Sequence, residues 1–139
     1  MNFSPELQKL CEDEAMDYFL VRSKERAREY GEIFTPTKLV LELLSQLPDT
    51  AWEEGKTYSA PAAGNGKVFV PVLYIKASLR HKNPLASIYG VELLQDNVDE
   101  CRFRLLEVAG QTEENNLHVM RNIRCADALK FDFNEFKES

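Results

Sequence analysis

Two glycines separated by one residue are the first candidates for chemistry in this sequence. Gly64-Asn65-Gly66 follows a run predicted as a strand, Thr57–Ala60, and precedes an apolar run predicted as a helix. In a strand–turn–helix unit, such a turn lets the backbone approach a ligand, and the helix N-terminus favours an anion. The turn therefore predicts a nucleotide-like ligand, although both glycines could instead serve only a tight turn.

Two common nucleotide-binding motifs do not match this turn. The dinucleotide fingerprint requires a third glycine where the sequence has Phe69. A P-loop requires glycine where the sequence has Pro61, and Ser or Thr where it has Val68. Both motifs are therefore disfavoured.

Two carboxylates follow predicted buried strands. Glu92 lies near the end of the strand Ser87–Leu93, and Asp127 follows a strand predicted at His118–Arg124. An ionised carboxylate only accepts hydrogen bonds, so either residue could hold a donor group of a ligand. Each residue also has a simpler interpretation, with Glu92 as a surface carboxylate and Asp127 as a cap or turn residue.

The histidines and cysteines do not suggest a metal site. His81 is predicted in an exposed basic loop and His118 at a strand start, and neither has a second ligand nearby in sequence. The sequence has three cysteines, an odd number, and they are widely spaced. This pattern argues against a disulfide framework and favours apolar packing of the cysteines in a reducing cytoplasm. They are Cys11, Cys101 and Cys125.

Two helices are predicted before these motifs, in an N-terminal segment spanning 1–48. The stretch Pro5–Tyr30 has apolar residues at three- and four-residue steps, which predicts one long amphipathic helix. For the second helix, Thr35 is the predicted cap, Pro36 the first residue and Pro48 the stop. These elements would lead into the glycine turn.

From residue 57 the predicted elements alternate between strands and helices. After the second strand, a helix is predicted with Asp96 as its cap and Gly110 as its end, followed by a polar loop at Gln111–Asn116. This alternation predicts an α/β fold, with a three-stranded parallel half-sheet and flanking helices over 57–139. We expect it to form one compact unit with the N-terminal helical segment.

Composition excludes several classes of protein. Of the 139 residues, 44% are hydrophobic and 29% charged, which indicates a folded core. No apolar run is long enough to cross a membrane. The net charge of −6 has the wrong sign for binding DNA mainly through phosphates, so DNA is expected only within a larger assembly. The basic run Arg22, Lys24, Arg26 and Arg28 is predicted as a solvated helix face.

Four short segments carry a more specific pattern. They are Phe34-Thr35-Pro36, Pro61–Gly66 (PAAGNG), Ile88–Glu92 (IYGVE) and Cys125–Asp132 (CADALKFD). In this order and spacing, the sequence resembles the AdoMet-binding half of the adenine-N6 DNA methyltransferases of restriction–modification systems. The resemblance covers most of residues 30–133. It implies a partial Rossmann-like methyltransferase fold that uses S-adenosyl-L-methionine (AdoMet).

The resemblance also implies a cofactor-binding role for each segment. The first segment corresponds to the one that closes over the methionine end of AdoMet, and the glycine turn to backbone beneath the cofactor. Glu92 corresponds to the acceptor for the ribose hydroxyls, and Asp127 to the acceptor for the adenine amino group. The implied cofactor-binding residues are Phe34, Thr35, Pro36, Ala62, Gly64, Asn65, Gly66, Glu92, Leu93, Asp127 and Ala128.

Two departures from the family pattern fall on the cofactor loop. The family usually has Asp immediately before Pro-Ala, close to the methionine amino group, and this sequence has Ala60. Losing one charge-assisted hydrogen bond costs about 1.5–3 kcal/mol, so AdoMet binding is expected to be weaker. Pro71 falls in the first turns of the next helix, which must therefore kink or start late. Both suggest a degraded or inactivated site.

The family's catalytic motif, Asn or Asp followed by Pro-Pro-Tyr or Pro-Pro-Phe, does not occur in these 139 residues. Asn83-Pro84 is followed by Leu85 and precedes the second strand. We therefore assign no catalytic residue and expect the isolated chain to be inactive unless another chain completes it.

Three functions remain open. The first is the AdoMet-binding part of an adenine-specific DNA methyltransferase. The second is a non-catalytic, methylase-derived interaction or regulatory protein that acts on a restriction–modification partner. The third is an independent small-molecule methyltransferase.

A further expectation concerns the edge of the sheet. In the family fold the first strand is central, so without a fourth strand one edge of Thr57–Ala60 is left unpaired. Because an exposed strand edge favours association, we expect the C-terminal tail, a homodimer contact or a second chain to cover it. The tail aromatics are predicted to pack on the sheet, with base stacking as the alternative. They are Phe131, Phe133 and Phe136.

Overall fold

The computed structural model describes residues 5, 9, 23–30, 32 and 35–137. Contacts divide the chain into two compact units, Met1–Trp52 and Glu53–Ser139. The first contains helices α2 (Lys24–Tyr30) and α3 (Thr37–Ser45) and the 3-10 turn η1 (Asp49–Trp52).

In the first unit, Ser23 contradicts the predicted continuous helix. This residue is not helical, and its hydroxyl accepts a hydrogen bond from the Arg26 N–H at 3.0 Å. A serine hydroxyl that satisfies a first-turn N–H begins a helix, so α2 starts anew at Lys24. Pro5 and Lys9 are helical, and the rest of the stretch before Ser23 lies outside the described residues. Arg26 also pairs with Glu32 at 2.7 Å, while Lys24 and Arg28 are exposed as predicted.

The second helix begins one residue later than predicted. Pro36 is the N-cap, with an extended ψ of 138°, and its carbonyl accepts from the Val40 N–H. Thr35 is therefore not the cap, and α3 has no side-chain cap hydrogen bond. Because Pro36 itself has an extended ψ, the first helical residue is Thr37. Val40 and Leu44 are the buried residues of this helix.

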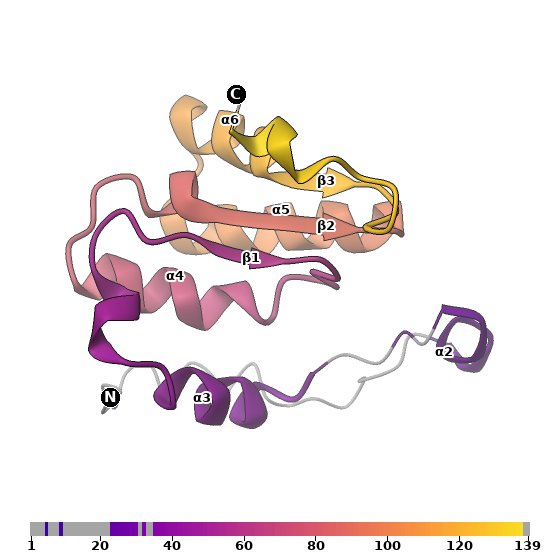
Figure 1. Cartoon of the computed structure of the whole chain (residues 1–139), viewed down its shortest axis with the longest axis horizontal. Coiled ribbons are helices and arrows are strands. Elements are labelled where there is room, and N and C mark those ends of the chain that lie inside the picture. The colour runs from indigo at the N-terminus through magenta and orange to yellow at the C-terminus, as the bar shows by residue number, and fades with distance from the viewer. Residues whose placement is uncertain (1–4, 6–8, 10–22, 31, 33–34, 138–139) are drawn as a thin grey trace. The chain divides into compact units, whose positions relative to one another are not determined.

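The second unit contains a three-stranded parallel sheet in the order β1-β2-β3 (Figure 1). The strands are β1 (Tyr58–Ala60), β2 (Ile88–Glu92) and β3 (Ile123–Cys125). Helices α4 (Phe69–Ser78), α5 (Gln95–Ala109) and α6 (Glu113–Asn122) complete this unit, with the 3-10 turns η2 (Pro84–Ser87) and η3 (Phe133–Phe136). The α/β class and the partial Rossmann-like sheet are confirmed.

The two faces of the sheet have different cover. Because side chains alternate along a strand, Gly90 faces one side and Tyr89 the other. A Cβ at Gly90 would lie 2.7 Å from the Phe69 ring, which places α4 on the first face. On the second face, the Tyr89 ring lies 4.9 Å from the ring of Phe136 in η3. The predicted packing of the aromatic tail on the sheet is therefore confirmed, with Phe131 between Phe133 and Phe136.

The third strand is shorter than predicted, and a helix replaces the polar loop before it. Residues Glu113–Asn122 form α6, so His118 lies in a helix, 3.7 Å from Glu114 one turn earlier. The Thr112 hydroxyl accepts from the Asn115 N–H, and two acidic residues occupy the first turn. This N-terminal capping favours a helix and outweighs the strand preference of the residues that follow. Only Ile123–Cys125 remain as a strand.

One buried lysine lies at the amino ends of the first two strands. Lys76 of α4 is only 1% exposed. Its ammonium group donates to the Lys56 carbonyl at 2.7 Å and to the Ser87 hydroxyl at 2.8 Å. It also lies 4.9 Å from the centre of the Tyr58 ring. These contacts join the segments that enter β1 and β2, and burial lowers the pKa of Lys76.

Candidate cofactor site at the carboxyl edge of the sheet

The glycine turn lies where β1 ends and is held against β2. Gly64 and Gly66 have φ values of +58° and +89°, in the region that favours glycine. The Ala63 N–H donates to the Val91 carbonyl at 2.9 Å, which fixes the turn to the middle strand. A Cβ at Gly66 would lie 2.9 Å from both Cα and Sγ of Cys101 in α5. The turn therefore needs glycine at position 66 for its backbone and for its approach to α5.

Glu92 connects this turn to the second strand and to α5. Its Oε1 accepts from the Gly64 N–H at 3.2 Å, and its Oε2 accepts from the Leu94 N–H at 2.9 Å. Oε2 also accepts from Nδ2 of Asn97 at 3.3 Å. Glu92 is only 9% exposed, so it is not a surface carboxylate. Its three donors suit an ionised carboxylate in a fixed orientation.

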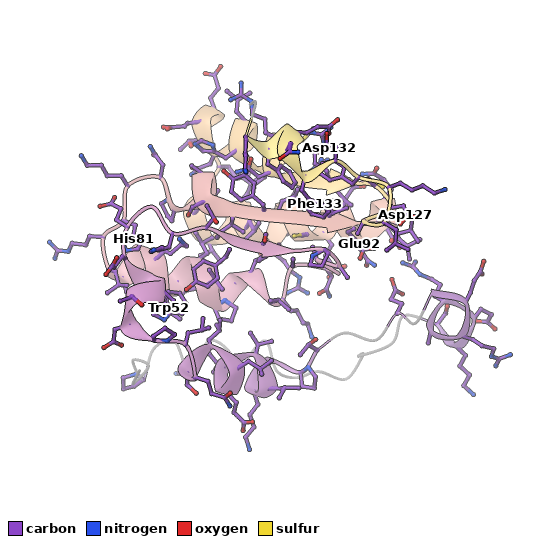
Figure 2. The ribbon with its side chains drawn as sticks, in the orientation of Figure 1. Trp52, His81, Glu92, Asp127, Asp132 and Phe133 are labelled. Carbon is purple, nitrogen blue, oxygen red and sulfur yellow. The ribbon has the colours of Figure 1, made fainter. Side chains whose placement is uncertain are left out.

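Asp127 lies at the same edge, after β3 (Figure 2). The Ala126 N–H donates to the Glu92 carbonyl at 3.0 Å, so the two motifs are joined through the backbone. Asp127 Oδ1 accepts from the Leu129 N–H at 3.0 Å, which is the turn role that the sequence left open. Asp127 and Ala128 are both half-buried. The carboxyl ends of the three strands thus bring together three of the predicted segments.

Exposed apolar side chains lie in the same loops. Leu93 is 49% exposed directly after Glu92, and Leu129 is 95% exposed in the loop after β3. Ala62 is exposed in the glycine turn. A flat, apolar group such as a nucleobase is a chemically suitable ligand for surfaces of this kind beside a carboxylate.

Asn65 is directed into the protein. It is 5% exposed, and its Oδ1 accepts from the Lys67 N–H at 3.4 Å. Its Nδ2 lies 3.5 Å from Glu100 Oε1 in α5. The described contacts of this side chain are therefore structural, whereas the backbone of the turn remains the candidate ligand contact.

The start of α4 offers less to an anion than the sequence predicted. The N–H groups of Phe69 and Val70 both donate to the Gly66 carbonyl, and Pro71 has no N–H. The helix begins at Phe69, so Pro71 lies in its first turn, where an N–H would lack an intrahelical acceptor in any case. The predicted late start is thus confirmed.

The remaining predicted site residues belong to the first unit. Thr35 and Pro36 are half-buried and precede α3, and Phe34 lies outside the described residues.

The cysteines differ in their surroundings. Cys101 is buried as predicted, and burial raises the pKa of its thiol to about 12. Cys125 is exposed, contrary to the prediction of apolar packing, because it occupies the open carboxyl end of β3 beside Leu93. Cys11 lies outside the described residues.

Sequence reasoning missed one residue of the site and misassigned another. Asn97 contacts Glu92 but was not singled out, although its position in the first turn of the helix after the acidic strand end was a usable signal. Asp96 was expected to cap α5, which instead begins at Gln95 with Leu94 as its N-cap. The Leu94 carbonyl accepts from both the Asn97 and Val98 N–H groups, so the helical hydrogen bonds of α5 begin at Leu94.

Neither a metal cluster nor a membrane span is found in the described part of the chain. No group of three or more His, Cys, Asp or Glu side chains there could hold a metal ion. None of the helices described is long and apolar enough to cross a bilayer.

The three parallel strands with their flanking helices define a partial Rossmann-like domain, with a glycine turn, an acidic strand end and a third polar loop at one edge. The family model for N-6 DNA methylase matches residues 13–137, and the chain belongs to this family. Its function is accordingly related to methyl transfer in N6 methylation of DNA. No curated protein and no solved structure matches the chain.

The residues at this edge fit a nucleoside cofactor. Glu92 contacts the turn backbone and keeps acceptor capacity beyond its three hydrogen bonds. Asp127 has a second carboxylate oxygen beyond the one in its turn, and Leu93 provides exposed apolar surface. These groups match the polar and apolar parts of an adenosine moiety.

Proposed function

We propose that this chain forms the AdoMet-binding part of an adenine-specific DNA methyltransferase. The observation that carries the proposal is the contact between the Glu92 carboxylate and the Gly64 backbone at the carboxyl edge, with the Asp127 loop bonded to the same strand end. In open parallel sheets, ligands bind outside the carboxyl ends of the strands. Membership of the N-6 DNA methylase family supports AdoMet as that ligand.

Each site residue has a defined role in this proposal. Glu92 accepts a hydrogen bond from the ribose, Asp127 accepts one from the adenine amino group, and Leu93 packs against the base. The Gly64–Gly66 backbone passes beneath the cofactor. AdoMet, when bound, supplies an activated methyl group. The residues of this chain orient the cofactor and exclude water from one side of it.

We assign the catalytic motif to residues outside these 139, on the same or another polypeptide. The family's Asn/Asp-Pro-Pro-Tyr/Phe motif does not occur in this sequence, and the isolated chain is then inactive. The described strands pair β1 only with β2. We propose that the second edge of β1 receives a further strand, from that catalytic region or from a partner chain. The aromatic tail does not supply it, because Phe136 contacts Tyr89 in the middle of the sheet.

The test is a calorimetric titration of AdoMet and of S-adenosylhomocysteine into the purified chain. We expect dissociation constants of about 1–100 µM, weaker than a site with Asp at position 60. The variant Ala60→Asp is expected to tighten AdoMet binding by about tenfold or more, because it restores one charge-assisted hydrogen bond. Absence of binding at millimolar ligand, with the protein shown to be folded, would contradict the proposal.

A second candidate is a non-catalytic interaction or regulatory protein that acts on a restriction–modification partner. Two observations favour it. Ala60 replaces the family's acidic residue, and the N–H groups of residues 69–71 are engaged or absent. In this case neither the native chain nor Ala60→Asp binds AdoMet. The purified chain would instead form a complex with a restriction–modification subunit, measurable by light scattering after gel filtration.

A further inference from the structure

Asn97 is a buried polar residue next to the Glu92 carboxylate. It lies in the first turn of α5 and is 0% exposed. Its Nδ2 donates to Oε2 of Glu92 at 3.3 Å, and the Leu94 N–H donates to the same oxygen at 2.9 Å. Since a carboxylate oxygen has two lone pairs, these two donors occupy Oε2.

The other oxygen of Glu92 has a different environment. Among the described residues, Gly64 is the donor to Oε1, with its N–H at 3.2 Å. Gly64 is half-buried, in the turn at the open edge of the sheet. Oε1 therefore keeps acceptor capacity beyond this hydrogen bond.

The torsion that orients a glutamate carboxylate is broad and roughly two-fold, so the side chain does not fix its own oxygens. Two donors on one oxygen and a third on the other remove this freedom. The Leu94 and Gly64 donors belong to the backbone, which leaves the Asn97 amide as the one side-chain donor of the three.

We infer that Asn97 is a positioning residue, which fixes the Glu92 carboxylate in the orientation that binds the ribose of a nucleoside cofactor. The inference rests on the proposed function and deepens it. Glu92 then accepts from the ribose hydroxyls with its carboxylate held in one orientation. Asn97 thus sets the strength of hydroxyl recognition without touching the ligand.

A matched control exists in the same unit. Asn122 is also buried, at 6% exposure, and its Nδ2 donates to the Leu85 carbonyl at 3.0 Å. Leu85 lies in η2, which precedes β2, so this hydrogen bond is at the opposite end of that strand from Glu92. Asn97→Ala and Asn122→Ala each remove one buried amide donor from a helix, but only the first removes a donor from Glu92.

The experiment measures calorimetric affinities for S-adenosylhomocysteine and its 2′-deoxy and 3′-deoxy analogues, with the native chain and both variants. In the native chain we expect at least one deoxy analogue to lose about tenfold in affinity. In Asn97→Ala the tenfold loss is expected to fall below about threefold, and in Asn122→Ala it should remain. Asn97→Asp, which keeps the volume but replaces the donor with an acceptor, gives the same comparison if Asn97→Ala does not fold.

The outcomes separate this inference from the proposed function. Equal weakening of all three ligands in Asn97→Ala would show a structural role only and overturn the inference, with the proposed function intact. Losses below about threefold for both deoxy analogues in the native chain would overturn hydroxyl recognition by Glu92 and the inference with it. If the native chain binds none of the three ligands, the proposed function fails and the inference fails with it.

Discussion

The two ends of the parallel sheet each contain a buried charged side chain, but they use it differently. At the amino ends of the strands, Lys76 donates to the Lys56 carbonyl and the Ser87 hydroxyl, and the Tyr58 ring faces its ammonium group. At the carboxyl ends, Glu92 accepts from three donors, contributed by Gly64, Leu94 and Asn97. Both charges are stabilised by groups of the chain itself.

The difference lies in what surrounds each charge. Lys76 is 1% exposed, and its partners join the segments that lead into β1 and β2. Glu92 is 9% exposed and is followed by Leu93, which is 49% exposed. The first arrangement is closed and stabilises the fold, whereas the second keeps acceptor capacity at an open edge. Variants at the two ends should therefore separate stability from binding.

The largest expected effect is at the closed end. Lys76→Ala should lower the free energy of unfolding by about 3–4 kcal/mol, because it leaves a cavity and two acceptors without their donor. Urea unfolding measures this change, and Lys82→Ala, which truncates an exposed lysine, should change it by less than about 0.5 kcal/mol. Affinity for S-adenosylhomocysteine should be unchanged in the folded variant. A large loss of affinity would contradict the separation of the two ends.

A slightly smaller loss of stability is expected from a substitution in the glycine turn, at Gly66. Gly66→Ala combines an unfavourable positive φ with a Cβ 2.9 Å from the Cys101 backbone, so it should destabilise the chain by about 3 kcal/mol. Gly55→Ala is the matched control, because its φ is +92° but no atom lies within 4 Å of the added Cβ. It should cost only about 1 kcal/mol. Equal melting-temperature losses in the two variants would refute a steric role for the close approach to α5.

At the carboxyl ends of the strands, Glu92→Gln should lower both the stability of the chain and its affinity for ligand. The amide places a donor among three donors, and this should cost about 2 kcal/mol of stability, measured by urea unfolding. Affinity for S-adenosylhomocysteine should fall by about tenfold or more, because a charge-assisted hydrogen bond to the ribose is lost. Glu100→Gln, which changes a carboxylate on α5 near Asn65, serves as the control for binding. A stable Glu92→Gln with native affinity would contradict the assigned role.

The last effect, which is absent at neutral pH, is an alkaline loss of stability from Cys101, which lies beneath the turn. Its folded pKa of about 12 exceeds the ordinary value of 9.0, so the unfolded chain loses this proton first. From about pH 9 to 12, this thiol alone should lower the free energy of unfolding by about 1.4 kcal/mol per pH unit. Cys101→Ala should show a correspondingly shallower decline in denaturation curves across this range. Cys125→Ala, which removes an exposed thiol, is the matched control.

Local sequence signals predicted much of the fold correctly. The first two strands and the helices between and after them were predicted within a few residues, because long apolar segments and Gly110 mark them. The prediction failed where two signals competed. The predicted strand His118–Arg124 overlaps a helix that is capped at Thr112, and the capped helix prevails as far as Asn122. At Ser23 and Pro36, the errors came from single capping residues.

The candidate site was only partly predictable. Its motifs could be read from residue types and order, since glycines and carboxylates have restricted chemistry. Their partners could not, because Gly64 and Glu92 are separated by 28 residues and the Asn97 amide reaches Glu92 only once α5 is packed. The buried position of Lys76 was equally hidden, since its acceptors precede two different strands.

The sequence alone therefore determined the class of fold, the positions of the glycine turn and the acidic strand end, and the family. These features depend on local backbone preference and on the order of motifs. Only the tertiary structure decided that Glu92 is held by three donors, that Asn97 is one of them and that Lys76 closes the other end of the sheet. Such properties arise when residues distant in sequence lose water together, and burial then requires each charge to find partners within the chain.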